Sequence, residues 1–293
     1  MQISVVIPTY NSASTIEATL ASVLKQSQAP SEIVVVDDAS SDNTLEILKR
    51  YGDRIRVLPR KKNAGCADVP RYEGVAASQS EWVALIDADD LWDPTKLEVV
   101  AATIATRPEI PLWHHYVRVI DRDGKGDRIR HEGTIPATGL IGRDLLHRCF
   151  ICTSAVVVRR EAWLQAQRLD QIRGFGTEID FFLALARNAP IGFIDQVLGS
   201  YRYTTSSISR KNWKRFSRDV VAMRRIYKKG LWKGIASRRE MRAILVDACR
   251  EDADHHRYNH RPGRSLWFCG QGLRYRPLDP GLWLRVGKLI FKG

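Results

Sequence analysis

Short apolar runs alternate with helix-like stretches along the first ninety residues of the chain. Strands are predicted where β-branched residues cluster, at 3–8, 32–36, 55–58 and 82–86, and again at 154–159. Helices are predicted at 15–26, 43–51, 66–78 and 178–187. The run Val34-Val35-Val36 is apolar on both faces, which is typical of a parallel strand covered by helices on both sides. The pattern predicts an α/β domain.

Polar residues follow three of these predicted strands. The three groups are Pro8-Thr9-Tyr10-Asn11, Asp37-Asp38-Ala39-Ser40 and Asp87-Ala88-Asp89-Asp90. In open α/β sheets, ligands bind beyond the carboxyl ends of the strands, so we expect these groups to share one rim. Asp87 and Asp89 point the same way if extended geometry persists. Their carboxylates suit Mg²⁺ or Mn²⁺, and substrate phosphates usually complete the shell of such an ion.

Two common nucleotide-binding loops are missing from the sequence. No Gly-x-Gly-x-x-Gly follows the first predicted strand, and no Gly-x-x-x-x-Gly-Lys-Ser/Thr occurs, which excludes a dinucleotide loop and a P-loop. A bound nucleoside diphosphate would therefore be held by a metal ion and by side chains such as Arg71, because a guanidinium matches phosphate geometry.

The motifs together resemble the family 2 glycosyltransferases. The resemblance is carried, in order and spacing, by the stretches 3–11, 34–42, 63–65 with Arg71, and 84–90. It covers about residues 1–205 and implies an A-type glycosyltransferase fold, with a mostly parallel central sheet flanked by helices. It also implies inverting transfer of a sugar from a nucleoside diphosphate donor, with a UDP-sugar favoured, to a hydroxyl of a glycan or lipid-linked glycan.

The resemblance also implies roles for individual residues. The donor nucleotide is expected to contact Pro8, Thr9, Tyr10, Asp37, Asp38, Arg71, Asp87 and Ala88. Mn²⁺ or Mg²⁺ is expected at Asp89, together with Asp87 and Asp90.

Two departures from the family pattern concern the acceptor side. The family's Glu-Asp-x-Asp corresponds best to Thr177-Glu178-Ile179-Asp180, after the glycine-containing segment 174–176. Glu178 is therefore the expected general base, and Asp180 is the competing one. Many relatives have a metal-reaching histidine near Thr204, in Tyr201-Arg202-Tyr203-Thr204, where this chain has none.

Charge separates the chain into two parts. Residues 205–293 contain 22 Lys and Arg against 7 Asp and Glu, a net +15, whereas the preceding residues carry 24 against 26, a net −2. We therefore predict a catalytic domain at 1–205, with a donor half at 1–98 and an acceptor half at 99–205, and a basic, mainly helical extension at 206–293. Because the excess charge is confined to the extension, a nucleic-acid partner is not expected.

The extension has two interpretations. Four of the eight tryptophans lie in it, and tryptophan mixed with basic residues suits an anionic membrane surface. In a helix over 281–292, the residues Leu282, Val286, Leu289 and Ile290 share one face, which fits either membrane docking or packing on the catalytic domain.

The rest of the composition points to a cytoplasmic protein. Five cysteines form no disulfide-like framework, no export signal precedes Ile3, and no apolar window is long enough to span a bilayer. The expected location is the cytoplasm, with peripheral binding to the inner face of the membrane if the extension docks there. The rival functions are a nucleotidyltransferase, which usually has a Gly-rich basic phosphate loop, and a non-enzymatic protein that binds anionic polymers or membranes.

Overall fold

The computed structural model describes residues 1–135, 137–166, 178–203 and 218–290. It divides into two compact units, each described by itself below. The first comprises Met1–Leu145 and Cys149–Thr204, and the second comprises Leu146–Arg148 and Thr205–Gly293.

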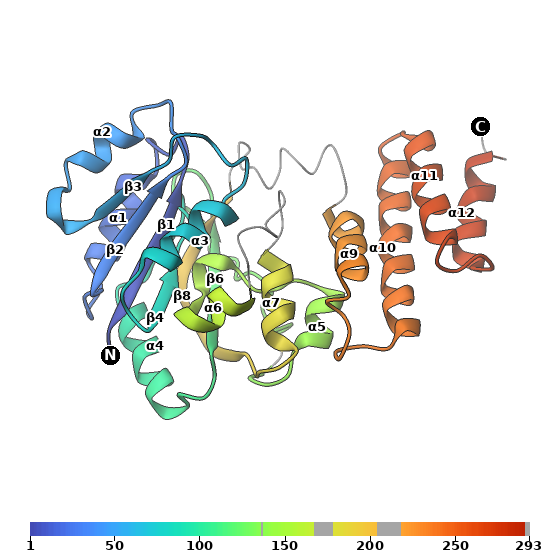
Figure 1. Ribbon diagram of the computed structural model, residues 1–293. Coiled ribbons are helices and arrows are strands. Elements are labelled where there is room, and N and C mark those ends of the chain that lie inside the picture. The colour runs from blue at the N-terminus through green and yellow to red at the C-terminus, as the bar shows by residue number, and fades with distance from the viewer. Residues whose placement is uncertain (136, 167–177, 204–217, 291–293) are drawn as a thin grey trace. The chain divides into compact units, whose positions relative to one another are not determined.

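The first unit is built on an eight-stranded sheet with the order β3-β2-β1-β4-β7-β6-β8-β5 (Figure 1). The strands are β1 (Ile3–Thr9), β2 (Glu32–Asp37), β3 (Arg56–Pro59), β4 (Trp82–Leu85), β5 (Leu91–Trp92), β6 (Leu112–Ile120), β7 (Val157–Arg159) and β8 (Gly192–Arg202). Strands β1 to β4 pair in parallel, and β6 pairs in parallel with β8. The remaining pairings, β4 with β7, β7 with β6 and β5 with β8, are antiparallel.

Helices alternate with the strands over the first ninety residues, as the sequence predicts, and further helices follow along the chain. The helices are α1 (Ile16–Leu24), α2 (Thr44–Lys49), α3 (Asp68–Ala77), α4 (Lys96–Thr106), α5 (Gly142–His147), α6 (Arg160–Ala166) and α7 (Glu178–Ala186), with short 3₁₀ turns at Gly52–Arg54 and Thr153–Ala155. The α/β fold is thus confirmed, with four parallel and three antiparallel strand pairings.

Close packing holds helix α3 against strands β1 and β2. Valines and isoleucines of β1 and β2 are fully buried, and α3 lies against both strands. A methyl group on Gly74 of α3 would lie only 2.5 Å from Val6 Cγ1 and 3.1 Å from Val36 Cγ2. Glycine at this position therefore allows α3, which carries Arg71, to approach the sheet closely.

The second unit is helical, as its sequence predicts. It consists of α9 (Arg218–Lys229), α10 (Arg238–Tyr258), α11 (Pro262–Leu273) and α12 (Pro280–Ile290). Ser237 and Glu240 form a capping box that begins α10: the Ser237 hydroxyl accepts the Glu240 N–H, and the Glu240 carboxylate accepts the Ser237 N–H. Within the described parts of both units, no helix combines the length and the apolar character needed to cross a bilayer.

Candidate active site

Three strand ends meet on one rim of the first unit because β2, β1 and β4 are adjacent and parallel. The loops after β1 and β2 are joined through Asn11. Its side-chain oxygen accepts the Ser41 N–H at 2.8 Å, and its own N–H donates to the Ser40 hydroxyl at 2.9 Å. Asn11 and Ala39 both have left-handed backbone conformations, with φ of 49° and 62°, which is uncommon outside functional or tightly constrained turns.

The end of β1 carries a buried polar atom without a hydrogen-bond partner among the described residues. This atom is the hydroxyl oxygen of Thr9. Pro8 beside it is buried, whereas Tyr10 is 45% exposed. A buried hydroxyl without a hydrogen-bond partner is costly. A group of the nucleotide that reached the Thr9 hydroxyl would supply the missing hydrogen bond. The predicted contacts of Pro8, Thr9 and Tyr10 with the nucleotide remain predictions.

The carboxylates of Asp37 and Asp38 stabilise the loop after β2 and the segment 63–65. The Asp37 carboxylate accepts the N–H and the hydroxyl of Ser40, at 3.0 and 2.5 Å. Asp38 forms an ion pair with Arg60 and accepts the Ala64 N–H at 3.0 Å. Asp38 therefore fixes the start of the Asn63-Ala64-Gly65 segment, and any contact with the nucleoside adds to that structural role.

Arg71 is the buried centre of an ion-pair network. Its guanidinium contacts Asp68 at 2.5 Å and Asp87 at 2.7 Å, while its Nε has no partner among the described residues. The attraction of these carboxylates outweighs burial and raises the pKa of Arg71. Asp68 was not predicted as a site residue, although its spacing of three residues from Arg71 on a helix could have indicated the pair.

Asp87 and Asp89 are partly exposed at the end of β4, with Ala88 buried between them. Burial, followed by the repulsion of Asp87, raises the pKa of Asp89 to about 6. Two hard oxygen donors that repel each other fit a divalent cation, which would relieve that repulsion. Among the described residues no group of three His, Cys, Asp or Glu side chains could hold a metal. Donor phosphates and water would therefore have to complete the coordination.

Asp90 has a different environment from the one predicted. It is fully buried, its Oδ2 accepts the Ser154 hydroxyl at 2.5 Å, and its Oδ1 accepts the Arg202 N–H at 2.8 Å. Both carboxylate oxygens are thus bound to protein groups and shielded from the rim. This arrangement does not fit the predicted metal contact of Asp90, and instead gives it the role of fixing the loop that carries Asp87 and Asp89.

Ser154 supports the same loop and was missed by sequence analysis. Its hydroxyl oxygen accepts the Asp87 N–H at 3.0 Å. Its carbonyl oxygen accepts the Trp92 indole N–H at 2.7 Å and a proton of the Lys96 ammonium at 3.1 Å. A single serine therefore ties the loop to the buried side of the sheet.

Arg202, at the end of β8, is the second supporting residue that sequence analysis missed. Its Nε donates to the Asp89 carbonyl at 2.9 Å, and its Nη1 donates to the Arg122 carbonyl at 2.7 Å. Arg202 could have been identified from its position in the stretch 201–204, where this chain departs from the family pattern. Thr204, which ends that stretch, lies outside the described residues.

Glu178 is the first residue of α7 and lies in the electrostatic field of the Arg71 network. Burial and the neighbouring Asp68 raise its pKa to about 7, with Asp87 acting in the same direction and Arg71 opposing it. Asp180 lies two residues further along α7, and residues two apart on a helix point to different sides. The predicted segment 174–176 and Thr177, which precede Glu178, lie outside the described residues.

Comparisons with known proteins identify the family and the fold of the chain. The model of the family "Glycosyl transferase family 2" matches residues 4–165. A protein of Bacillus subtilis named as the teichuronic acid biosynthesis glycosyltransferase TuaG is 31% identical over 216 residues, which cover 72% of this chain and 83% of TuaG. The Escherichia coli glucosyltransferase WfgD, named for a GlcNAc-diphosphoundecaprenol acceptor, is 38% identical over 98 residues, covering 33% of this chain and 38% of WfgD.

Solved structures show the same fold. S. aureus TarS 1-349 in complex with UDP-GlcNAc matches with a TM-score of 0.67 and 20% identity, covering 94% of this chain and 81% of that one. The same TarS fragment in complex with UDP matches with a TM-score of 0.66 and 21% identity, covering 99% and 88%. With the family match over residues 4–165 and the similarity to TuaG, these findings show that the chain is a glycosyltransferase with the A-type fold and belongs to family 2.

Proposed function

We propose that this enzyme transfers a sugar from a nucleoside diphosphate sugar, with a UDP-sugar favoured, to an acceptor hydroxyl, with inversion at the anomeric carbon. The observation that carries the proposal is the ion pair of Arg71 with Asp87 at the end of β4, with Glu178 near enough to interact electrostatically with both residues. It combines groups that suit an anionic leaving diphosphate with a carboxylate that can receive a proton.

The donor would be held by the residues at the strand ends. Thr9, Tyr10 and Asp38 suit contacts with the nucleoside. The Thr9 hydroxyl has no partner among the described residues, and the Asp38 N–H donates to the Thr9 carbonyl, so the two strand ends are adjacent. Asp89, with Asp87, would hold a divalent cation. When bound, such an ion neutralises the diphosphate charge. Arg71 keeps its positive charge and orients Asp87 through their ion pair.

Glu178 would act as the general base. As the acceptor oxygen bonds to the anomeric carbon, its proton passes to the Glu178 carboxylate. The bond from that carbon to the diphosphate breaks, and the electron pair leaves with the diphosphate. A pKa of about 7 suits this role, because the carboxylate is ionised in a large fraction of molecules at neutral pH and is still basic enough to accept a proton.

The acceptor is proposed to be a surface glycan under construction, carried on a lipid. TuaG is named for teichuronic acid biosynthesis, and WfgD for a diphosphoundecaprenol-linked acceptor. A lipid-linked acceptor requires the enzyme to work at a membrane surface, which agrees with the strongly basic composition of residues 205–293.

The decisive experiment measures donor hydrolysis and transfer with a panel of UDP-, GDP- and TDP-sugars in Mn²⁺, in Mg²⁺ and in chelator. We expect turnover with one donor class, and calorimetry should show that the matching nucleotide binds more tightly with Mn²⁺ than with chelator. Asp89→Asn should bind the nucleotide equally with Mn²⁺ and with chelator. Asp93→Asn, at a position outside the rim network, is the matched control and should keep the difference.

Two results would contradict the proposal. Equal nucleotide affinity with Mn²⁺ and with chelator would remove the assigned cation site. Release of pyrophosphate from a nucleoside triphosphate and a sugar phosphate, without sugar transfer, would identify a nucleotidyltransferase instead.

A further inference from the structure

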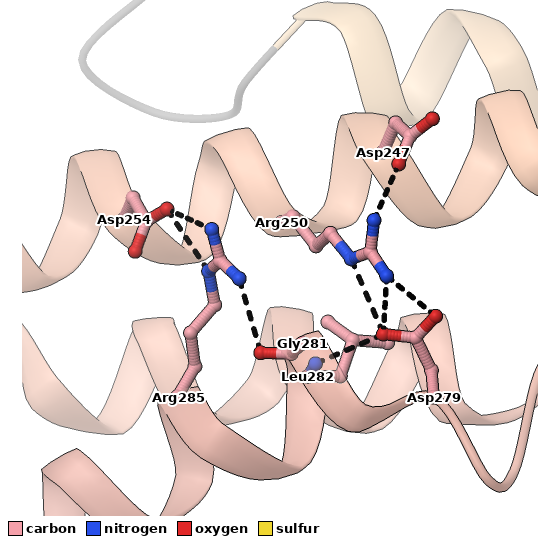
Figure 2. A network of polar contacts seen from close by, with 7 residues as sticks. All are labelled: Asp247, Arg250, Asp254, Asp279, Gly281, Leu282 and Arg285. Carbon is pink, nitrogen blue, oxygen red and sulfur yellow. Dashed lines mark hydrogen bonds and ion pairs between the residues drawn. The ribbon is translucent and has the colours of Figure 1, made fainter.

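Helix α12 is fixed to α10 through one face. Arg250 of α10 forms an ion pair with Asp279, reaching both carboxylate oxygens at 2.6 Å, and Arg285 donates to Asp254 of α10 at 2.9 Å (Figure 2). The Asp279 carboxylate also accepts the Leu282 N–H at 3.0 Å, which caps the start of α12. Leu282 is fully buried. Leu282 and Arg285 define the inner face of α12.

Helix α11 also turns one face toward α10. The Ser265 hydroxyl donates to the Ala253 carbonyl of α10 at 2.6 Å. A methyl group on Gly272 would lie 3.1 Å from Cys249 of α10 and 2.6 Å from Leu282 of α12. The buried residues of α11 and α12 thus face α10 and each other, and the exposed residues of each helix lie on its other side.

The exposed sides of both helices carry large apolar residues: Leu266 and Trp267 on α11, and Trp283, Leu284 and Ile290 on α12. These five residues are called the outer face below. Trp267 is 49% exposed, Trp283 53%, and Leu284 and Ile290 59% each. On α12 the residues Trp283, Gly287 and Ile290 follow helical spacing on the side opposite Arg285, and Gly287 has open space beside it. The exposed side of a helix is normally polar, so an exposed apolar face indicates a binding surface.

The charge of the segment that carries this face is almost entirely positive, and the partly exposed carboxylate of Asp254 on α10 pairs with Arg285 on the inner side. Residues 257–290 contain seven Lys and Arg and a single acidic residue, Asp279. Asp279 is buried in its ion pair with Arg250, so no carboxylate of this segment reaches the surface. Arg274 and Lys288 are exposed, and Lys288 follows Leu284 by one helical turn. The surface therefore combines apolar anchors with positive charge.

We propose that this outer face docks on an anionic lipid bilayer. Trp267 and Trp283 suit the headgroup level, the aliphatic side chains suit the acyl boundary, and Arg274 and Lys288 suit lipid phosphates. The surface differs from the one predicted from sequence, which grouped Leu282 with Ile290, because Leu282 belongs to the inner face. The purpose of docking rests on the lipid-linked acceptor proposed above, but lipid binding itself needs neither donor nor acceptor.

The test is flotation of the full-length protein with phosphatidylcholine vesicles, with and without phosphatidylglycerol, in the absence of substrates. We expect binding only to the anionic vesicles. The double variant Trp267→Ser/Trp283→Ser should reduce the partition coefficient by about tenfold or more, through the loss of apolar area. Arg274→Glu and Lys288→Glu should each reduce it by about fivefold. Leu140→Ser, which removes an exposed leucine of the first unit, is the matched control and should bind normally.

A second measurement separates insertion from surface adhesion. Brominated lipids should quench tryptophan fluorescence in the wild type, and Trp283→Phe should lose part of that quenching while still floating. Circular dichroism and sedimentation velocity identify any unfolded or dimeric variant.

Three results would overturn the proposal: a wild type that never floats at low salt, variants that float like the wild type, or a dimer that Trp283→Glu dissociates without any lipid binding. Because transfer to a water-soluble acceptor is measured separately, failure of lipid binding does not imply failure of the proposed transfer reaction.

Discussion

The acidic residues at the strand ends divide according to what their carboxylates contact. Asp37 and Asp90 are fully buried and accept hydrogen bonds from nearby serines, so they shape the loops. Asp38 also lies within the protein, against Arg60. Asp87 and Asp89 are partly exposed and remain accessible to a ligand. At the residue scale, three of these carboxylates thus have structural partners, and two remain exposed for the proposed cation and donor contacts.

Glu178→Gln tests the base directly. Because the amide cannot accept the acceptor proton, kcat should fall by about 10²- to 10⁴-fold, while calorimetric affinity for the donor nucleotide stays near that of the wild type. The pKa of Glu178 is raised to about 7, and a general base acts in its ionised form. Wild-type turnover should therefore rise with pH up to about 7 and then level off.

The control for this prediction is Asp180→Asn, a neutralisation on the same helix. It should retain turnover and the same pH profile. If Asp180→Asn loses turnover without unfolding while Glu178→Gln keeps it, the base is Asp180.

Ser154→Ala tests the support of the Asp87 loop. The change leaves the buried Asp90 carboxylate and the Asp87 N–H each without one partner, and an unpaired buried group costs about 1–3 kcal/mol. We expect a lower Tm and a weaker donor affinity, measured by differential scanning calorimetry and by nucleotide titration. Thr106→Ala removes an exposed hydroxyl that donates to the Thr103 carbonyl, and should change neither. Normal nucleotide affinity in Ser154→Ala would exclude the positioning role.

At the scale of elements, the sequence predicted what is encoded by neighbouring residues. The predictions of strands such as β2 were correct because a local run of apolar residues determines these strands. The polar residues of the rim were predicted because they directly follow the strands. The contacts of Asp90 were not predictable in this way, because Ser154 and Arg202 are 64 and 112 residues distant. Helical spacing likewise places Leu282 on an apolar face of its helix, but it does not show which neighbouring element covers that residue.

A matched pair of glycines tests the packing of α11. Gly272→Ala would place a methyl group 2.6 Å from Leu282 Cδ1, whereas a methyl group on Gly270 has open space. Overpacking typically costs about 1–3 kcal/mol, while an alanine in an open helical position gains about 0.5–1 kcal/mol over glycine. Chemical denaturation followed by helical ellipticity should therefore show opposite shifts. Equal stability of the two variants would contradict the close contact between α11 and α12.

At the scale of the whole molecule, charge is distributed unevenly along the chain. Residues 205–293 carry a net +15, and the preceding residues carry a net −2. The segment with the catalytic motifs is therefore almost neutral overall. An attraction to anionic surfaces would originate in the extension, and it would be sensitive to ionic strength.

Salt should therefore separate two activities of the same enzyme. Because the Debye length shortens from about 10 Å at 0.1 M to about 3 Å at 1 M, added NaCl should raise the KM for an acceptor embedded in anionic vesicles. The KM for the donor with a water-soluble acceptor should stay nearly constant. Both are measured by steady-state transfer assays, and an equal salt effect on the two acceptors would show that the extension does not contribute to acceptor delivery.

The connection of the first two rim loops through Asn11 has a consequence for the thermodynamics of donor binding. The backbone N–H and the side-chain oxygen of Asn11 fix the turn at Ser40 and Ser41 before any ligand arrives. Fixing the backbone of one residue costs about 1–2 kcal/mol of conformational entropy, and here folding has already met that cost for both loops. A nucleotide bound at the proposed site would therefore order little additional chain, and more of its contact energy would be retained as affinity.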